Sequence, residues 1–231
     1  VSHVDSPRLD LKMNPFIEDE EFLILNTHYY GGIKKYQWVA TPLSIHGVVI
    51  LKNGKKVDLV IGEKDDDPVF CIPDILPHLS ANVQDGRKAR EVIKGEELKV
   101  LFASKPVENE DAKQKIKANI LAELKRQYKI EEEDFFSAEI EIVPALKARD
   151  IGFDRGMIGA YGQDDRICAY TSLKAVMEVK KNEKTTLCYL TDKEEIGSDG
   201  STGLKSNLIE YYIGKLIKLK EKSYDDLMLK E

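Results

Sequence analysis

The feature that most constrains the fold of this 231-residue chain is the stretch HGVVILKNGKKVDLVIG, residues 46–62. Two runs rich in β-branched residues flank Asn53-Gly54, the dipeptide that best supports a two-residue hairpin turn. The stretch therefore predicts two antiparallel strands joined by a tight turn. This hairpin lies within a middle segment, residues 18–147, whose patterns predict a β-rich α+β unit.

Elsewhere in the middle segment, some stretches have the two-residue period of a strand and one has the period of a helix. EFLILNTHYY at 21–30 predicts a strand, and PVFCIPDI at 68–75 is a strand candidate that Pro73 interrupts. SAEIEIV at 137–143 has period two, which predicts a strand with one solvated face. Residues 111–130 have the helical period, and their apolar face comprises Ile116, Ile120, Leu121, Leu124 and Tyr128.

The segments on either side of the middle segment follow a different order. Residues 1–6 predict a short strand that ends at Pro7. Later patterns predict a helix at 164–180, a buried strand at 185–190, a glycine-rich turn at 191–203 and a helix at 204–221. This order is typical of an α/β layer around a largely buried sheet. We therefore expect one α/β domain, formed by 1–17 and 148–231, interrupted by an inserted unit at 18–147.

The composition excludes some classes of function. Apolar residues make up 42% and charged residues 33% of the chain, which is typical of a globular protein. The net charge of -6 argues against a broad nucleic-acid surface, because phosphate binding needs a surplus of Lys and Arg. No apolar run approaches the length of a membrane span, and no signal peptide is recognised. The opening VSHVDSPRLDLK reads like an internal strand, so we expect a piece of a longer protein.

The three cysteines are odd in number, widely spaced and set among apolar neighbours. They are Cys71, Cys168 and Cys188. This usage predicts buried, reduced thiols in a cytoplasmic protein, rather than disulfides or a zinc knuckle.

His3 and Asp5 form the first candidate for a metal site. On a strand the two side chains point to the same face. A histidine that binds a metal through one ring nitrogen usually has its other nitrogen held by an acceptor, and a nearby carboxylate suits that role. Ordinary packing of a histidine at the end of a strand explains the pair equally simply. From these residues alone both interpretations stay open.

Two pairs of adjacent carboxylates are the next candidates. Asp164 and Asp165 open the helix predicted at 164–180, where the helix dipole favours one of them, and a carboxylate can also bridge two cations. Glu194 and Glu195 follow the predicted strand at 185–190, at the edge where α/β sheets gather their ligand sites. One glutamate of such a pair can bind a metal while the other moves protons. A solvated loop accounts for the same residues.

The last candidate is His78, at the end of CIPDILPHLS, residues 71–80. Two prolines bracket a short apolar segment before this histidine. A structured loop with a surface histidine explains the stretch, and its residues alone favour nothing else.

Taken together, four stretches resemble the aspartyl aminopeptidase and aminopeptidase I family of zinc metallopeptidases. They are SHVDSPRLDLK, HYYGGIKKYQW, GQDDR and DKEEIGSDGSTG. The resemblance runs in the right order across essentially the whole chain, and the combination is specific although each motif alone is weak to moderate. It implies a mixed-sheet catalytic domain of three αβα layers, interrupted by a dimerisation domain.

The resemblance also implies roles for individual residues. His3 binds a metal and Asp5 orients it, while Asp165 bridges two metals as the second aspartate of GQDDR. Glu194 is the general base, and Glu195 is a metal ligand. His78 is a further site residue, and it reaches the active site of a partner subunit.

The implied activity is release of single N-terminal residues from peptides that have a free N-terminus, with acidic-specific and neutral-preferring members in the family. Two zinc ions are expected per site, and cobalt or manganese tolerate similar ligands. The implied assembly is a homodimer as building block of a tetrahedral dodecamer, with no nucleic-acid or membrane partner. A related deacylase or dipeptidase, and a non-catalytic assembly fragment, are the alternatives.

The family has two further metal ligands after the glutamate pair, an aspartate and a histidine. After Glu195 the chain offers no histidine, and none of its aspartates fits the family pattern; these are Asp199, Asp225 and Asp226. We therefore expect the chain by itself to lack part of each metal's coordination shell.

Overall fold

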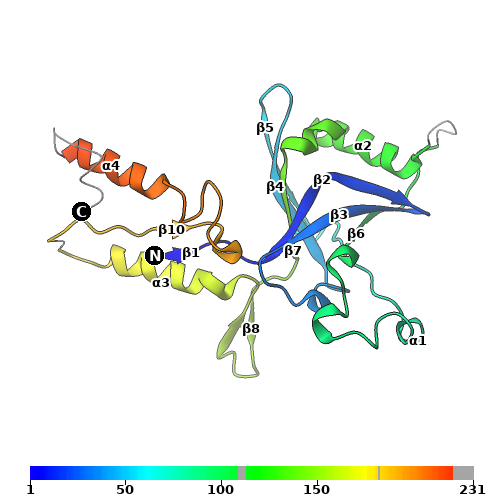
Figure 1. Ribbon diagram of the computed structural model, residues 1–231, viewed down its shortest axis with the longest axis horizontal. Helices are drawn as coiled ribbons and strands as arrows, with labels where there is room; N and C mark the ends of the chain where they lie inside the picture. The colour runs from blue at the N-terminus through cyan, green and yellow to red at the C-terminus, as the bar shows by residue number, and fades with distance from the viewer. Residues whose placement is uncertain (109–112, 182, 221–231) are drawn as a thin grey trace. The chain divides into compact units, whose positions relative to one another are not determined.

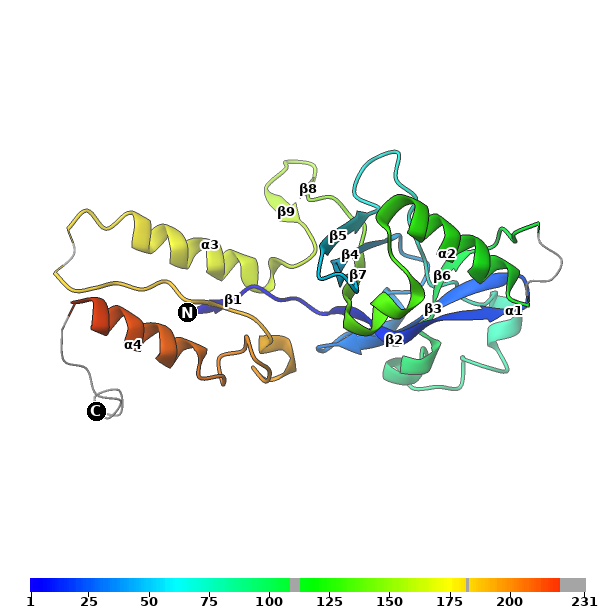
Figure 2. The ribbon, with the colours of Figure 1, turned by 90° about the horizontal axis from the view of Figure 1, so that it is seen from above.

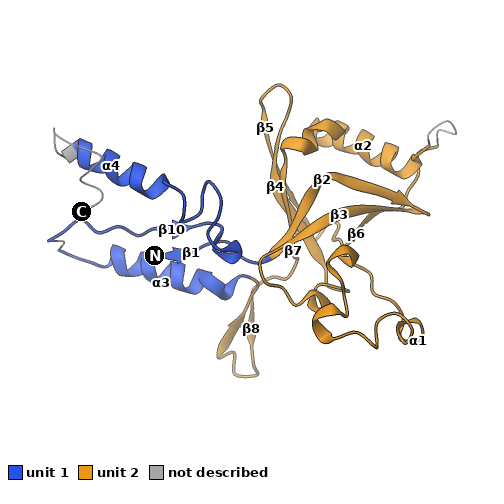
Figure 3. Cartoon of the chain, in the orientation of Figure 1, with its two compact units in different colours: residues 1–7, 162–231 blue, residues 8–161 orange. Residues whose placement is uncertain are grey.

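The chain divides into two compact units in this computed structural model, which describes residues 1–108, 113–181 and 183–220. Unit 2 comprises Arg8–Tyr161, and unit 1 comprises Val1–Pro7 with the described residues from Gly162 onward (Figure 3). Unit 2 therefore includes residues on both sides of the segment 18–147. The difference arises because the first strand of its sheet begins directly after Pro7 and a second hairpin follows residue 147.

Unit 2 is built on a six-stranded antiparallel sheet with the strand order β5-β4-β7-β2-β3-β6 (Figure 1). The strands are β2 (Arg8–Asp19), β3 (Phe22–Tyr30), β4 (Leu43–Ile50), β5 (Lys56–Ile61), β6 (Val100–Ala103) and β7 (Glu139–Pro144). The strands predicted at 21–30 and 137–143 are confirmed as β3 and β7. Strand β2 was not predicted, because Pro15 and a register shift between Leu11 and Phe16 interrupt its alternation.

The predicted hairpin is confirmed as the antiparallel pair β4–β5, which is joined by residues 51–55. Gly54 has φ +80°, and its amide donates to the carbonyl of Leu51. The Asn53 side chain accepts a hydrogen bond from the amide of Lys55 at 3.0 Å. The turn is therefore longer than the two-residue turn that we expected, although Asn53 and Gly54 provide its bend.

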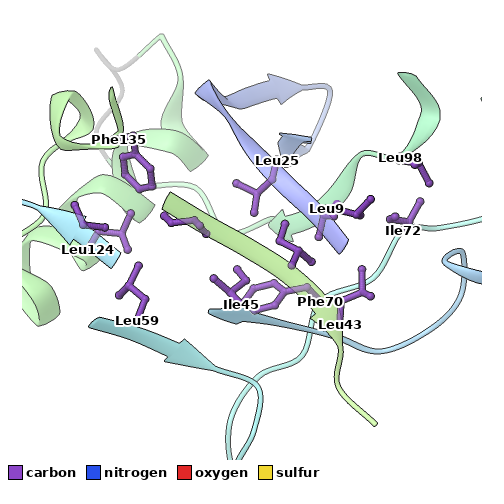
Figure 4. Close-up of a cluster of buried hydrophobic side chains, with 14 of the residues drawn as sticks. Leu9, Leu25, Leu43, Ile45, Leu59, Phe70, Ile72, Leu98, Leu124 and Phe135 are labelled. Atoms are coloured by element: carbon purple, nitrogen blue, oxygen red, sulfur yellow. The ribbon is translucent and has the colours of Figure 1, made fainter. Parts of the chain in front are cut away.

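One face of the sheet forms the core of unit 2 (Figure 4). Leu9, Ile45 and Ile142 meet across three neighbouring strands, and each is nearly inaccessible to solvent. The alternation in β7 explains this arrangement, since Ile140 and Ile142 face the core while Glu139 and Glu141 lie on the other side.

Helix α2 (Lys115–Tyr128) covers part of this core, as Figure 2 shows. The helix predicted at 111–130 is thereby confirmed for its described residues, and Asp111 and Ala112 lie outside them. Leu124 is buried, and Ile120 and Tyr128 are partly buried against the core. The first turn of α2 is held from β2, because the Glu18 carboxylate accepts the amides of Ile116 and Lys117 at 3.3 and 2.8 Å.

The remaining elements of unit 2 are short. They are η1 (Lys35–Gln37), α1 (Pro77–Ser80), η2 (Ala89–Glu91), η3 (Gly95–Glu97), η4 (Glu132–Ser137) and the hairpin β8 (Arg149–Ile151) and β9 (Met157–Gly159). The strand expected at 68–75 is wrong, because only isolated bridges from Phe70, Cys71 and Ile72 join this segment to other strands. Pro68 and Pro73 at its ends remove amide donors that a regular ladder needs.

Unit 1 contains a two-stranded parallel sheet, β1 (Ser2–His3) with β10 (Leu190–Thr191). In Figures 1 and 2 this pair lies between helix α3 (Gln163–Met177) and helix α4 (Leu208–Lys220). Both predicted helices are confirmed for the described residues, and Glu221 lies outside them. The short helix η5 (Glu194–Ile196) follows β10.

Two further predictions are wrong, one for a strand of unit 1 and one for the cysteines. The strand expected at 185–190 shrinks to Leu190–Thr191, and Thr185, Thr186 and Leu187 are exposed rather than buried. The thiol of Cys168 is exposed, and Cys71 and Cys188 are half-buried, although all three are free as expected. Apolar sequence neighbours thus did not ensure burial, since burial depends on the tertiary packing of each segment.

No described helix of the chain is long and apolar enough to cross a membrane.

Candidate functional site

The parallel pair β1–β10 brings the candidate residues of unit 1 together. Ser2 pairs with Leu190 and His3 with Thr191, so both strands end at the same edge. His3 is the last residue of β1 and Asp5 follows it, while Glu194 and Glu195 follow β10 at the same edge. The position predicted for Glu194 and Glu195, beyond the carboxyl end of a strand, is therefore confirmed.

The ring of His3 is buried, with 11% of its side chain exposed. Its Nδ1 lies 3.0 Å from the carbonyl oxygen of Asp5 and 3.3 Å from the Asp5 carboxylate. Both neighbours are acceptors, so Nδ1 carries the proton and the Nε2 lone pair is directed away from Asp5 in the neutral ring. This is the tautomer that a metal ligand needs.

Two carboxylates lie on the Nε2 side of the ring. Asp164 Oδ1 is 3.3 Å and Glu194 Oε2 is 3.6 Å from His3 Nε2. Both carboxylates are more than half exposed, at 87% and 54% of the side chain. Acidic oxygens from two separate segments therefore lie within 3.6 Å of His3 Nε2, and both carboxylates are open to solvent.

Asp165 contacts other groups of the protein, whereas the bridging role expected for it needs a carboxylate that is open to metal ions. Its carboxylate accepts the backbone amide of His3 at 3.3 Å. The thiol of Cys168 also donates to Asp165, and this hydrogen bond is the main cause that lowers the pKa of Asp165. Asp164 and Asp165 both have non-helical backbone angles at the start of α3. The carboxylate that faces the His3 ring is thus the first of the pair.

Sequence reasoning missed this position of Asp164. The helix-dipole interpretation applied to either aspartate of the pair, and the residue pattern held no signal for the direction of each side chain. The distinguishing signal is the contact with His3, about 160 residues away, which the fold alone provides.

The glutamate pair lies in η5, whose backbone is fixed by Asp5. The Asp5 carboxylate is buried, and it accepts the amides of Glu194 and Glu195 at 3.2 Å each. Of the two glutamates, Glu194 lies within 3.6 Å of the His3 ring. Glu195 is half-buried, and His3 and the neighbouring acidic groups act on its charge.

The electrostatics of the cluster favour a bound cation. Burial raises the pKa of Glu195, and the charges of Asp164, Asp5 and Glu194 raise it further against the opposing effect of His3. Burial opposes protonation of His3, but Asp5, Glu194 and Asp165 raise its pKa overall. Five carboxylates thus surround one imidazole, and a cation would relieve their repulsion.

The donor set also fits zinc. In a tetrahedral zinc site with ligand distances of 2.0–2.1 Å, neighbouring ligand atoms are about 3.3 Å apart. The distance of 3.3 Å from His3 Nε2 to Asp164 Oδ1 matches this edge length. Among the described residues no group of three or more His, Cys, Asp or Glu side chains is arranged to hold a metal ion. The cluster at His3 therefore offers donor types that zinc binds, without a full set of ligands.

His78 belongs to unit 2, in the four-residue helix α1, whereas the other predicted site residues lie in unit 1. Its side chain is exposed, within a segment that also exposes Leu76 and Leu79. This is the surface position expected of a histidine in a structured loop, and it is equally compatible with a contact to a second subunit.

The chain is similar to known proteins over its full length. The family model of aminopeptidase I zinc metalloprotease (M18) matches residues 1–230. A relative from Borrelia garinii subsp. bavariensis, described as a probable M18 family aminopeptidase 1, is 55% identical over 233 residues. This match covers 100% of the chain and 51% of the relative, so the chain spans about half the length of the curated relatives it matches.

Solved structures agree with this likeness. The crystal structure of an M18 family aminopeptidase from Thermotoga maritima has a TM-score of 0.91 and 47% identity, with 99% of the chain and 49% of that protein covered. The S. cerevisiae mApe1 dodecamer has a TM-score of 0.62 at 21% identity, with 92% and 47% covered, and shares the fold.

The expected resemblance, the geometry of the cluster at His3 and the match over residues 1–230 agree with one another. The chain belongs to the aminopeptidase I zinc metalloprotease (M18) family.

Proposed function

We propose that the whole protein is a two-metal aminopeptidase that releases single residues from peptides with a free N-terminus. The observation that carries this proposal is the convergence of His3 Nε2 with the Asp164 and Glu194 carboxylates at the ends of β1 and β10. The activity is assigned to the whole protein, because the chain spans about half of the length of its relatives. Acidic N-terminal residues are one class of substrate to test.

Each residue of the site has a role in the proposed reaction. Bound zinc ions supply Lewis-acid catalysis and lower the pKa of water. Glu194, half exposed beside the His3 ring, takes a proton from the attacking water and returns it to the leaving amine. His3 and Glu195 would hold the metals, and Asp5 fixes the tautomer of His3 through the acceptors at Nδ1.

We assign the bridging position to Asp164 in place of Asp165. Asp164 faces His3 Nε2 and is open to solvent, whereas Asp165 is engaged by the His3 amide and by Cys168. A carboxylate that already accepts two hydrogen bonds has fewer lone pairs left for a cation.

The architecture of the whole protein is part of the proposal. The position of β1–β10 between α3 and α4 supports a three-layer αβα catalytic domain, and unit 2 is the inserted dimerisation domain. The exposed apolar side chains around His78 support a subunit contact, through which His78 would reach the partner's active site. A dimer that builds a tetrahedral dodecamer is the proposed assembly, and the S. cerevisiae mApe1 structure is a dodecamer. The free thiols suit the reducing cytoplasm.

The experiment uses the whole gene product, loaded with zinc, and peptides that differ only in a free or acetylated N-terminus. Release of the first residue from the free peptides alone supports an aminopeptidase. Cleavage of the acetylated peptides instead supports a deacylase of similar site chemistry. A protein that binds no zinc and cleaves neither set would support the non-catalytic alternative. Repeating the assay with cobalt and manganese identifies the preferred metal.

Glu194→Gln is the matched variant. It should keep the zinc content of the protein and lower kcat by about 10²–10⁴-fold, as expected when a general base is lost. Glu195→Gln should lower the zinc content, which atomic absorption measures. A Glu194→Gln protein with near-native kcat would exclude Glu194 as the base.

A further inference from the structure

The Asp5 carboxylate contacts more than the His3 ring. Its Oδ1 lies 3.3 Å from His3 Nδ1 and accepts the amide of Glu194 at 3.2 Å. Its other oxygen, Oδ2, accepts the amide of Glu195 at 3.2 Å. Only 1% of the Asp5 side chain is exposed, so water does not compete effectively for these hydrogen bonds. One buried carboxylate therefore joins the end of β1 to the backbone of η5.

The backbone of η5 has the form that receives an anion. Lys193 has a left-handed conformation, with φ 66° and ψ 17°, and Gly197 has φ 84° at the other end. A left-handed residue beside a turn directs successive amides toward one point, and such a concavity binds anions. Here the Asp5 carboxylate fills it. A left-handed lysine is uncommon, and the two charge-assisted hydrogen bonds stabilise it.

We propose that Asp5 is a positioning residue for the general base as well as for His3, because it clamps the backbone of Glu194 and Glu195. The expected effect on kcat rests on the proposed function. The hydrogen bonds from the Glu194 and Glu195 amides to Asp5 do not, because they are a property of the folded chain. Orientation of His3 alone would affect only metal binding. The clamp also fixes where the Glu194 side chain begins, and therefore its distance to the reacting water.

The first experiment measures amide hydrogen exchange of Glu194 and Glu195 by NMR on the full chain without metal. Both amides should be protected, and Asp5→Asn should accelerate their exchange by about tenfold or more, because an asparagine side chain accepts through one oxygen only and carries no charge. Asp192→Asn is the control, since Asp192 contacts Thr202 and Lys193 but neither of the two amides. It should leave their exchange unchanged.

The second experiment separates the two roles of Asp5 in the zinc-loaded whole gene product. A residue that only orients His3 would weaken zinc binding, and kcat would recover at saturating zinc. If Asp5 also holds the backbone of η5, the kcat of Asp5→Asn should stay about 10–100-fold below that of the unmodified protein when zinc occupancy is complete. KM should change little, since the binding surface for the peptide is untouched.

The outcomes distinguish this inference from the proposed function. Unprotected Glu194 and Glu195 amides in the unmodified chain would overturn the clamp, even if Asp5→Asn fails to fold. Full recovery of kcat at saturating zinc would overturn its kinetic consequence. If the unmodified whole gene product cleaves no peptide, the proposed function fails, and the exchange data still decide the clamp.

Discussion

At the scale of single residues, the site depends on which atoms face the His3 ring. Acceptors from Asp5 hold Nδ1, and the Asp164 and Glu194 carboxylates face Nε2. The adjacent Asp165 is directed to the His3 amide and Cys168 instead. Neighbouring residues of the same type thus have different partners, because their backbone angles at the start of α3 direct them differently.

The two aspartates should differ in their effect on metal binding. Asp164→Ala in the whole gene product should lower the zinc content at both metal positions, since a bridging carboxylate supports both ions. Asp165→Ala should cost mainly local stability, through loss of its hydrogen bonds to the His3 amide and Cys168. Zinc content by atomic absorption and urea unfolding measure the two effects. Loss of zinc in Asp165→Ala but not in Asp164→Ala would instead assign the bridging role to Asp165.

A second residue-scale prediction concerns pH. The hydrogen bond from His46 Nε2 to Glu63 at 2.8 Å, aided by Ser44 and opposed by burial, lowers the pKa of Glu63. Because the folded pKa is below the unfolded value of about 4.3, the stabilisation is present above that value and is lost as pH falls through the folded pKa. Lys147 is the other charged group that lowers this pKa.

Glu63→Gln should therefore lower Tm at pH 7 and have a smaller effect at about pH 3, because the native carboxylate takes up protons as pH falls. Circular dichroism melts at the two pH values measure this difference. The same change at the exposed Glu21 is the control. An equal loss of Tm at both pH values would contradict the link to ionisation of Glu63.

At the scale of elements, contacts between segments decide where helices and strands begin. Helix α2 starts without a side-chain cap from Gln114, and Glu18 of β2 takes this role from a distance in the chain. In β4, a methyl group on Gly47 would overlap the carbonyl oxygen of Glu139 in β7, so a glycine is required for this close approach. Glu18 is far from α2 in the sequence, and Glu139 is far from Gly47.

Removal of the remote cap should destabilise unit 2. Glu18→Ala leaves the amides of Ile116 and Lys117 without their carboxylate, and it should cost about 1 kcal/mol of unfolding free energy. Urea unfolding followed by circular dichroism measures the change. Glu21→Ala, at the start of β3, should have little effect. Equal losses for the two variants would show that Glu18 does not act through α2.

At the scale of the whole molecule, the two units differ in how much apolar surface they bury. Unit 2 has a contiguous core of residues from its sheet, α2 and η4. In the described part of unit 1, Ala169 is the one apolar residue that counts as buried, while α3 exposes Ile167, Tyr170 and Met177. Parallel sheets are normally covered on both faces, so these exposed side chains need a further covering surface.

The units should therefore differ in local stability when the chain is studied by itself. Amides of β3 and β7 should exchange hydrogen at least about tenfold more slowly than amides of α3 and α4, because local opening of unit 1 exposes little additional apolar surface. Exchange measured by mass spectrometry tests this difference. In the whole gene product, slower exchange in α3 and α4 than in the chain alone would show that further residues cover these helices. Equal protection of both units in the chain alone would contradict the prediction.

The sequence by itself determined the family, the order of the main elements and the segments that carry the site. The Asn53-Gly54 turn, the alternation at 137–143 and the helical periods at 111–130 and 164–180 are local signals, and local physics suffices for them. Tertiary structure decided the rest. Pairing of β1 with β10 brought the candidate residues to one sheet edge, and the fold placed Asp164, rather than Asp165, beside Nε2 of the His3 ring. Such choices depend on residues far apart in the chain, whose distances and directions no local pattern contains.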